Sequence, residues 1–156
     1  MLKADDKFFM TQALGLAKEA AAQGEVPVGA LIVRNGVIVG RGQNRREQGK
    51  NALAHAEIEA IEAACRNLDG WRLWECDLYV TLEPCPMCAG AIINSRIRRL
   101  VFGAYDPKAG SCGSLVNLFD LPYNHKPELL GGFMADESSK LLKDFFRDLR
   151  EKDPKA

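Results

Sequence analysis

The 156-residue sequence has no excess of charge of either sign, because 21 Lys and Arg residues balance 21 Asp and Glu residues. The overall field of such a chain does not attract nucleic acid, so any RNA contact must come from a local patch of cations. The sequence also lacks a run of about 18 apolar residues, which excludes a transmembrane helix. No Pro-, Gly- or Ser-rich linker divides the chain, and we expect one domain over residues 1–156.

Cysteine is scarce and odd in number, at five residues. The first residues do not form a signal peptide, because Asp5 and Asp6 interrupt them and no apolar segment follows. An odd number of cysteines without a secretion signal argues against a disulfide framework. We therefore expect a cytoplasmic protein.

Hydrophobic spacing and turn residues predict alternating helices and strands. The Asn35 and Gly36 pair predicts a type I′ β-hairpin, and residues 41–53 read as a polar loop. The strand–helix–strand order predicts a parallel part of the sheet with helices on both faces, so the fold class is a three-layer α/β/α domain with a mixed sheet of about five strands. The expected helices cover 5–23, 54–68, 86–95, 115–119 and 135–150, and the expected strands cover 28–33, 37–39, 77–82, 99–102 and part of 122–132.

Apolar residues of the last predicted helix recur at helical spacing. We expect them to face inward: Leu141, Leu142, Phe145, Phe146 and Leu149.

Two short motifs offer zinc ligands. His55 and Glu57 begin one predicted helix, and Cys85 and Cys88 begin another, directly after a strand. The positive end of a helix favours the thiolate form that binds metal, and the C-x-x-C spacing lets both sulfurs reach one ion. Three ligands leave the fourth position open, which is the coordination of a catalytic zinc site. Glu57 follows His55 by two residues, a spacing that suits a proton carrier better than a fourth ligand.

Other interpretations of these motifs remain open. Cys85 and Cys88 alone would also fit a redox dithiol. A closed structural zinc site would need a fourth ligand, and Glu57 alone would usually be a solvated helix residue. The candidate fourth ligands are Cys65, Cys76, Cys112 and His125.

The H-x-E and P-C-x-x-C motifs together resemble the zinc-dependent nucleobase deaminases of the cytidine-deaminase-like superfamily. Further motifs narrow the resemblance, from about Phe9 to Arg150, to the bacterial tRNA-specific adenosine deaminases. These motifs are Gly24 to Ala30, Asn44, Ala54 to Glu57, Leu78 to Ala91, Val101 to Ala104, Gly113 to Leu115, Asn124 with His125, and Asp144 to Arg147.

The resemblance implies an activity and a set of roles. One zinc ion per subunit would be bound by His55, Cys85 and Cys88, and Glu57 would move protons while the amino group at C6 of a flipped adenine is replaced by oxygen from water. The product would be inosine at the wobble position of a tRNA anticodon loop, formed by a homodimer with no membrane contact. The implied substrate-binding residues are Asn44, Val26, Pro27, Ala56, Leu82, Asp106, Lys108, Asn124, His125, Phe146 and Arg147.

Simpler roles also fit several of these residues. Asn44 can be a turn former, and Phe145 and Phe146 can both be core residues, or one can be core while the other stacks on a base. Arg147 can complement the end of its helix without any RNA. The sequence also departs from the family: Asn51, Ala52 and Leu53 precede the histidine motif where some members have Asp-Pro-Thr.

The alternative functions are a free nucleobase or nucleoside deaminase of the guanine or cytosine type, since Pro86 also occurs in such enzymes, and a structural zinc module.

Overall fold

The computed structural model describes residues 1–153 and contains one five-stranded sheet, in the order β2-β1-β3-β4-β5. The β1 strand is antiparallel to both β2 and β3, whereas β3, β4 and β5 run parallel. The sheet is therefore mixed, as predicted. The strands are β1 (Gly29–Arg34), β2 (Val37–Gln43), β3 (Cys76–Leu82), β4 (Arg99–Ala104) and β5 (Glu128–Leu130).

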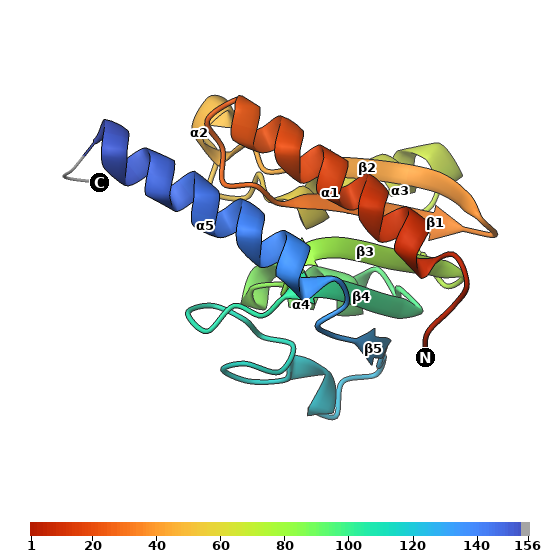
Figure 1. Cartoon of the computed structure of the whole chain (residues 1–156). Coiled ribbons are helices and arrows are strands. Elements are labelled where there is room, and N and C mark those ends of the chain that lie inside the picture. Colours follow the sequence, from red (N-terminus) through yellow and green to blue (C-terminus); the bar gives the residue numbers. More distant parts are fainter. Residues whose placement is uncertain (154–156) are drawn as a thin grey trace.

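Helices cover both faces of this sheet (Figure 1). The α1 (Asp6–Ala22) and α5 (Ala135–Lys152) helices lie on one face, and α3 (Ala56–Leu68) and α4 (Pro86–Asn94) lie on the other. Strand residues alternate between the two apolar cores: Leu31 packs in the α1 side, and its neighbours Ala30 and Ile32 pack in the α3 side. The predicted three-layer α/β/α class is confirmed.

The predicted hairpin is present between β1 and β2. Asn35 and Gly36 have φ values of 50° and 76°, and a type I′ turn requires positive φ at both positions. The β2 strand is longer than predicted and pairs as far as Gln43 with Gly29. The predicted polar loop 41–53 therefore loses its first residues to the sheet, and it also contains a short helix, α2 (Arg46–Gly49).

Two glycines let β2 lie directly on α3. A Cβ atom at Gly42 would lie 2.1 Å from the carbonyl oxygen of Ala56, and one at Gly40 would lie 2.3 Å from that of Ala60. These separations are far below van der Waals contact, so only glycine permits this approach. The contact fixes the first turn of α3, which carries Glu57.

The region after β4 differs from the sequence prediction. No helix covers 115–119; instead a 3₁₀ turn covers Leu118–Asp120, because the Asn117 side chain accepts a hydrogen bond from the Phe119 amide and caps the turn there. The inward orientation predicted for two residues of α5 is wrong, since Phe146 is 40% and Leu149 39% exposed. Figure 1 shows the reason: the C-terminal half of α5 extends past the strands.

A buried ion pair joins the N-terminus to the sheet. The Arg99 guanidinium donates to Asp6 at 2.6 and 2.8 Å, and the Tyr79 hydroxyl donates to the same carboxylate at 2.6 Å. Asp6 and Arg99 are at most 1% exposed. Burial alone would raise the pKa of Asp6, but the hydrogen bonds from Arg99, Tyr79 and the Lys3 amide lower that pKa to about 2.

Within the described residues, no helix is both long and apolar enough to span a membrane.

The pKa of Asp6 predicts a pH dependence of stability. Because the folded pKa is depressed, the contribution of the ionised carboxylate is complete above the unfolded value of 3.8 and is lost as the pH falls toward about 2. Asp6→Asn, which leaves the buried Arg99 with only the more distant Asp77 carboxylate at 3.5 Å, should cost roughly 3–5 kcal/mol at pH 6. Urea unfolding should show this difference between wild type and Asp6→Asn shrinking between pH 4 and pH 2. The exposed Asp120→Asn variant is the control, and a difference that stays constant over this range would contradict the prediction.

Candidate metal and base-binding site

Two helices begin next to each other and carry the metal-ligand residues. His55 is the residue before α3, and Cys85 is the residue before α4; both have extended backbone, with ψ values of 150° and 175°. Pro86 occupies the first turn of α4, where its missing N–H is not needed. Both side chains therefore lie at the positive ends of helix dipoles, which favours a thiolate.

The ligand atoms of His55, Cys85 and Cys88 lie within 4.8 Å of one another. The Nδ1 atom of His55 is 3.7 Å from the Cys85 sulfur and 3.5 Å from the Cys88 sulfur. For bonds of about 2.0 Å to nitrogen and 2.3 Å to sulfur, tetrahedral coordination puts nitrogen and sulfur about 3.5 Å apart. Both nitrogen–sulfur distances therefore agree with the binding of one zinc ion by the three residues.

The protonation of these ligands is already unequal without a metal. A hydrogen bond from Cys88, opposed by burial and aided by His55, lowers the pKa of Cys85 to about 4. The same hydrogen bond, together with burial, raises the pKa of Cys88. Without a metal this interaction favours the thiolate form of Cys85 and the protonated form of Cys88, so that metal binding displaces a proton.

Glu57 lies beside this group but does not belong to it. Among residues 1–153, no carboxylate, other cysteine or second histidine joins the three ligands, so the structure supplies no fourth ligand for a closed site. The Glu57 side chain is almost fully buried, and burial raises the pKa of Glu57 to about 7. A carboxyl group with this pKa can both accept and deliver a proton near neutral pH.

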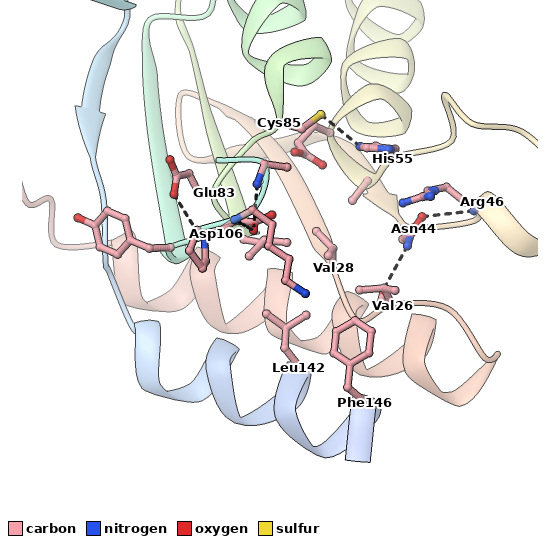
Figure 2. A pocket seen from close by; sticks show the side chains of 17 residues that line it. Val26, Val28, Asn44, Arg46, His55, Glu83, Cys85, Asp106, Leu142 and Phe146 are labelled. Carbon is pink, nitrogen blue, oxygen red and sulfur yellow. Dashed lines mark hydrogen bonds between the residues drawn. The ribbon is translucent and has the colours of Figure 1, made fainter. Parts of the chain in front are cut away.

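A pocket of about 420 Å³ opens over the ligand group (Figure 2). Its volume lies in the range of small-ligand sites, roughly 300–1,000 Å³. Apolar residues from several elements form its walls, and polar residues surround the ligand group. The lining comprises Val26, Val28, Asn44, Arg46, His55, Ala56, Glu57, Leu82, Glu83, Cys85, Tyr105, Asp106, Pro107, Lys108, Ala109, Leu142 and Phe146.

Asn44 forms a turn and also lines the pocket, and its contact with a base stays a prediction. Its Oδ1 accepts a hydrogen bond from the Arg46 amide at 3.3 Å, which forms an Asx turn, and its Nδ2 donates to the Val26 carbonyl at 3.4 Å. It also lines the pocket, and Figure 2 shows it on the side of His55 and Arg46. The turn therefore fixes Asn44 at the pocket wall.

Of the two phenylalanines in α5, Phe146 lines the pocket and Phe145 does not. The two rings pack edge to face, with centroids 5.4 Å apart, and Phe145 is the more buried. Phe146 is therefore the ring available to a base.

Four of the predicted substrate-binding residues do not line this pocket: Pro27, Asn124, His125 and Arg147. Pro27 is buried, and Asn124 is exposed. His125 lies against Trp74, and its Nε2 is 2.7 Å from the Ile97 carbonyl oxygen. Arg147 forms an ion pair with Asp144 at 3.3 Å. Their contact with substrate stays a prediction.

Other lining residues were missed by the sequence analysis, notably Arg46, Glu83, Tyr105 and Leu142. Leu142 lies four residues before Phe146 on α5, so helical spacing could have placed it beside that ring. Arg46 carried no signal, because it belongs to a stretch predicted as loop. Neither its guanidinium nor the Lys108 ammonium forms an ion pair within the described part of the chain.

The three-layer fold, the two-Cys-one-His ligand group and the adjacent buried Glu57 together define a deaminase. A family model described as MafB19-like deaminase matches residues 4–150. The chain is 48% identical over 148 residues to the tRNA-specific adenosine deaminase of Bacillus subtilis, covering 94% of this chain and 92% of that protein.

Solved structures agree with this classification. One from a study of A-to-I editing by tRNA:A34 deaminases superposes with a TM-score of 0.84 at 45% identity, covering 87% of this chain and 99% of the other. A guanine deaminase from Nitrosomonas europaea superposes with a TM-score of 0.76 at 28% identity, covering 93% and 86%. The chain belongs to the MafB19-like deaminases and, among them, to the family of tRNA-specific adenosine deaminases.

The ligand geometry predicts how zinc affinity responds to mutation. Cys85→Ala and Cys88→Ala should each weaken zinc binding by more than about a hundredfold, since each removes one of three ligands. Competition with a zinc-chelating indicator measures this change. Cys65→Ala is the matched control, because this half-buried thiol lies outside the ligand group. Equal losses in all three variants would show that the ion binds elsewhere.

Proposed function

We propose that this chain deaminates adenosine to inosine, with release of ammonia, at the wobble position of a tRNA anticodon loop. The observation that carries the proposal is the pocket, which combines a zinc-type ligand group and a buried acid with the exposed cations Arg46 and Lys108 and the exposed aromatic rings of Tyr105 and Phe146. A deaminase of free bases or nucleosides would need a closed pocket. A deaminase that acts on RNA needs an open pocket lined with cations and aromatic rings. The proposal treats residues 1–156 as one deaminase domain, of which the structure describes residues 1–153.

In the proposed reaction, His55, Cys85 and Cys88 hold zinc, which supplies the Lewis acidity that activates water near neutral pH. Glu57 accepts one proton from water and delivers it to a ring nitrogen of adenine. It then accepts the second proton from the hydroxyl group added at C6 and delivers it to the departing amine, which leaves as ammonia. A buried carboxyl with a pKa of about 7 before metal binding is suited to this transfer in both directions. Glu57 is thus the proposed catalytic residue.

The remaining predicted residues bind the nucleotide. Asn44 contacts the purine edge, Val26 and Leu82 wall the pocket, and the Ala56 backbone lies near the reacting amine. Pro27, which is buried next to Val26 in the sequence and does not line the pocket, supports this wall. Phe146 stacks on a base, and Asp106 and Lys108 contact the loop backbone. Outside the pocket, Asn124, His125 and Arg147 contact the rest of the anticodon loop. The proposal includes the homodimer and the cytoplasmic location implied by the resemblance.

A direct test compares RNA substrates of different shape. Extruding a stacked base costs a few kcal/mol, and least when the base is unpaired, so adenosine in a seven-membered hairpin loop should be converted much faster than the same adenosine in a perfect duplex. Glu57→Gln should keep zinc but lose about 10²–10⁴-fold in turnover on the hairpin. Inosine is measured by sequencing or mass spectrometry.

Two outcomes would contradict the proposed function. Equal rates on hairpin and duplex would exclude loop recognition. Turnover of free guanine or cytidine in preference to the hairpin would favour the free-base alternative, for which the similarity to a guanine deaminase is the supporting observation.

The two unpaired pocket cations predict a salt dependence. Arg46 and Lys108 line the pocket and form no ion pair with an acidic residue among residues 1–153, so each can neutralise an RNA phosphate. Arg46→Ala and Lys108→Ala should weaken hairpin binding and reduce the slope of log affinity against log salt by roughly 0.7 each. Fluorescence anisotropy at several salt concentrations measures the slope. Arg66→Ala, which removes an exposed arginine beside Glu62 on α3, is the control and should leave the slope unchanged.

A further inference from the structure

The Glu83 carboxylate accepts four hydrogen bonds from the loop after β4. Its side chain is buried, although it directly follows a strand end. Its Oε1 accepts from the Asp106 amide at 2.9 Å, and its Oε2 accepts from the amides of Cys112 at 3.0 Å and Ser114 at 2.9 Å. The Ser114 hydroxyl also donates to it. A carboxylate has about four acceptor positions, and this loop fills them.

The same loop forms one wall of the pocket. Asp106 and Lys108 line it, and the Asp106 carboxylate accepts the amides of Lys108 at 3.0 Å and Ala109 at 3.3 Å. Figure 2 shows Glu83 reaching the Asp106 backbone. Glu83 therefore fixes Asp106, and Asp106 fixes the turn that carries Lys108.

The carboxylate also packs directly against the loop backbone. A Cβ atom at Gly110 would lie 2.3 Å from Cδ of Glu83 and 2.4 Å from its Oε1. Glycine at this position leaves room for the carboxylate inside the loop.

Glu25 makes the equivalent contacts on the other side of the pocket. Its side chain is 0% exposed, and its two oxygens accept the amides of Glu47 at 3.0 Å and Gln48 at 2.8 Å. These amides belong to α2, whose first residue is Arg46. Arg46 and Asn44 lie across the pocket from Asp106 (Figure 2).

We propose that Glu25 and Glu83 are positioning residues that hold the two RNA-facing loops, 45–49 and 105–114, in the geometry that binds substrate. The inference rests on the proposed function for its substrate. Both carboxylates bond loop amides, and neither belongs to the apolar cores that build the sheet. Because a loop ordered beforehand need not be ordered on binding, these contacts lower the cost of RNA association rather than the barrier of the chemical step.

The test measures the loops and the kinetics separately. In Glu83→Gln one acceptor oxygen becomes a donor, so the amides of Asp106, Cys112 and Ser114 should exchange hydrogen at least about tenfold faster, as NMR can resolve. The amides of Glu47 and Gln48 should be unchanged. Glu25→Gln should give the reverse pattern.

On the zinc-loaded protein, each variant should raise KM for the anticodon hairpin by about tenfold or more, with kcat within about threefold and zinc retained. Gly110→Ala is a second variant that changes no charge: its Cβ would displace the Glu83 carboxylate and would also lie 2.5 Å from the Asp106 carbonyl oxygen, so it should loosen the same loop and behave like Glu83→Gln. The controls are Glu19→Gln and Gly15→Ala on α1; nothing lies within 4 Å of an added Cβ at Gly15.

Protection of the loop amides at the wild-type level in these variants would overturn the proposal. Loss of zinc, or of kcat at unchanged KM, in both Glu83→Gln and Gly110→Ala would also overturn it, because Glu83 would then support Cys85 instead of the loop. If the wild-type protein converts no hairpin, the proposed function fails, whereas the exchange pattern still decides whether the two glutamates order the loops.

Discussion

The α3 and α4 helices begin against each other at the ends of β1–β3, and the rest of the site is arranged around that meeting point. Each helix is preceded by a residue in extended conformation, and those residues are His55 and Cys85. The contact of β2 with α3 through Gly42 fixes the start of α3. The start of α4 is positioned by β3, which ends at Leu82, three residues before Cys85. Three ligand atoms thus converge from two helix starts in one layer, each of them held by the sheet, which pre-positions the ligands for a single ion.

Buried glutamates in this protein show how environment decides charge. Glu57 and Glu83 are similarly inaccessible, at 4% and 2% exposure. Burial dominates for Glu57 and raises its pKa to about 7. Burial would also raise the pKa of Glu83, but hydrogen bonds from Ser114, Asp106 and Cys112 outweigh it, so that pKa is lowered. One carboxyl group is thereby suited to exchanging protons and the other to remaining a fixed anion.

Local sequence signals predicted the regular parts of the fold and the ligand group. The hairpin follows from Asn35 and Gly36, and the zinc motif from spacing at two helix starts. What failed depends on tertiary contacts: α2 exists because Glu25, some twenty residues earlier, accepts its amides. Phe146 and Leu149 of α5 are exposed because the C-terminal half of the helix extends past the sheet. The spacing of apolar residues along the helix does not indicate where the sheet ends. Arg46 and Tyr105 reach the pocket through loops whose paths no local pattern specifies.

The glycines of the first two strands do not tolerate substitution, in contrast to residues that only line the pocket. Side chains at Gly29, Gly40 or Gly42 would enter the backbone of α1 or α3. Tyr105 and Leu142 face the pocket from its periphery and meet no such barrier. A mutational library intended to change the nucleobase accepted here would retain folded members if it varied those peripheral residues, whereas randomising the three glycines would mostly produce chains that cannot assemble the metal group at all.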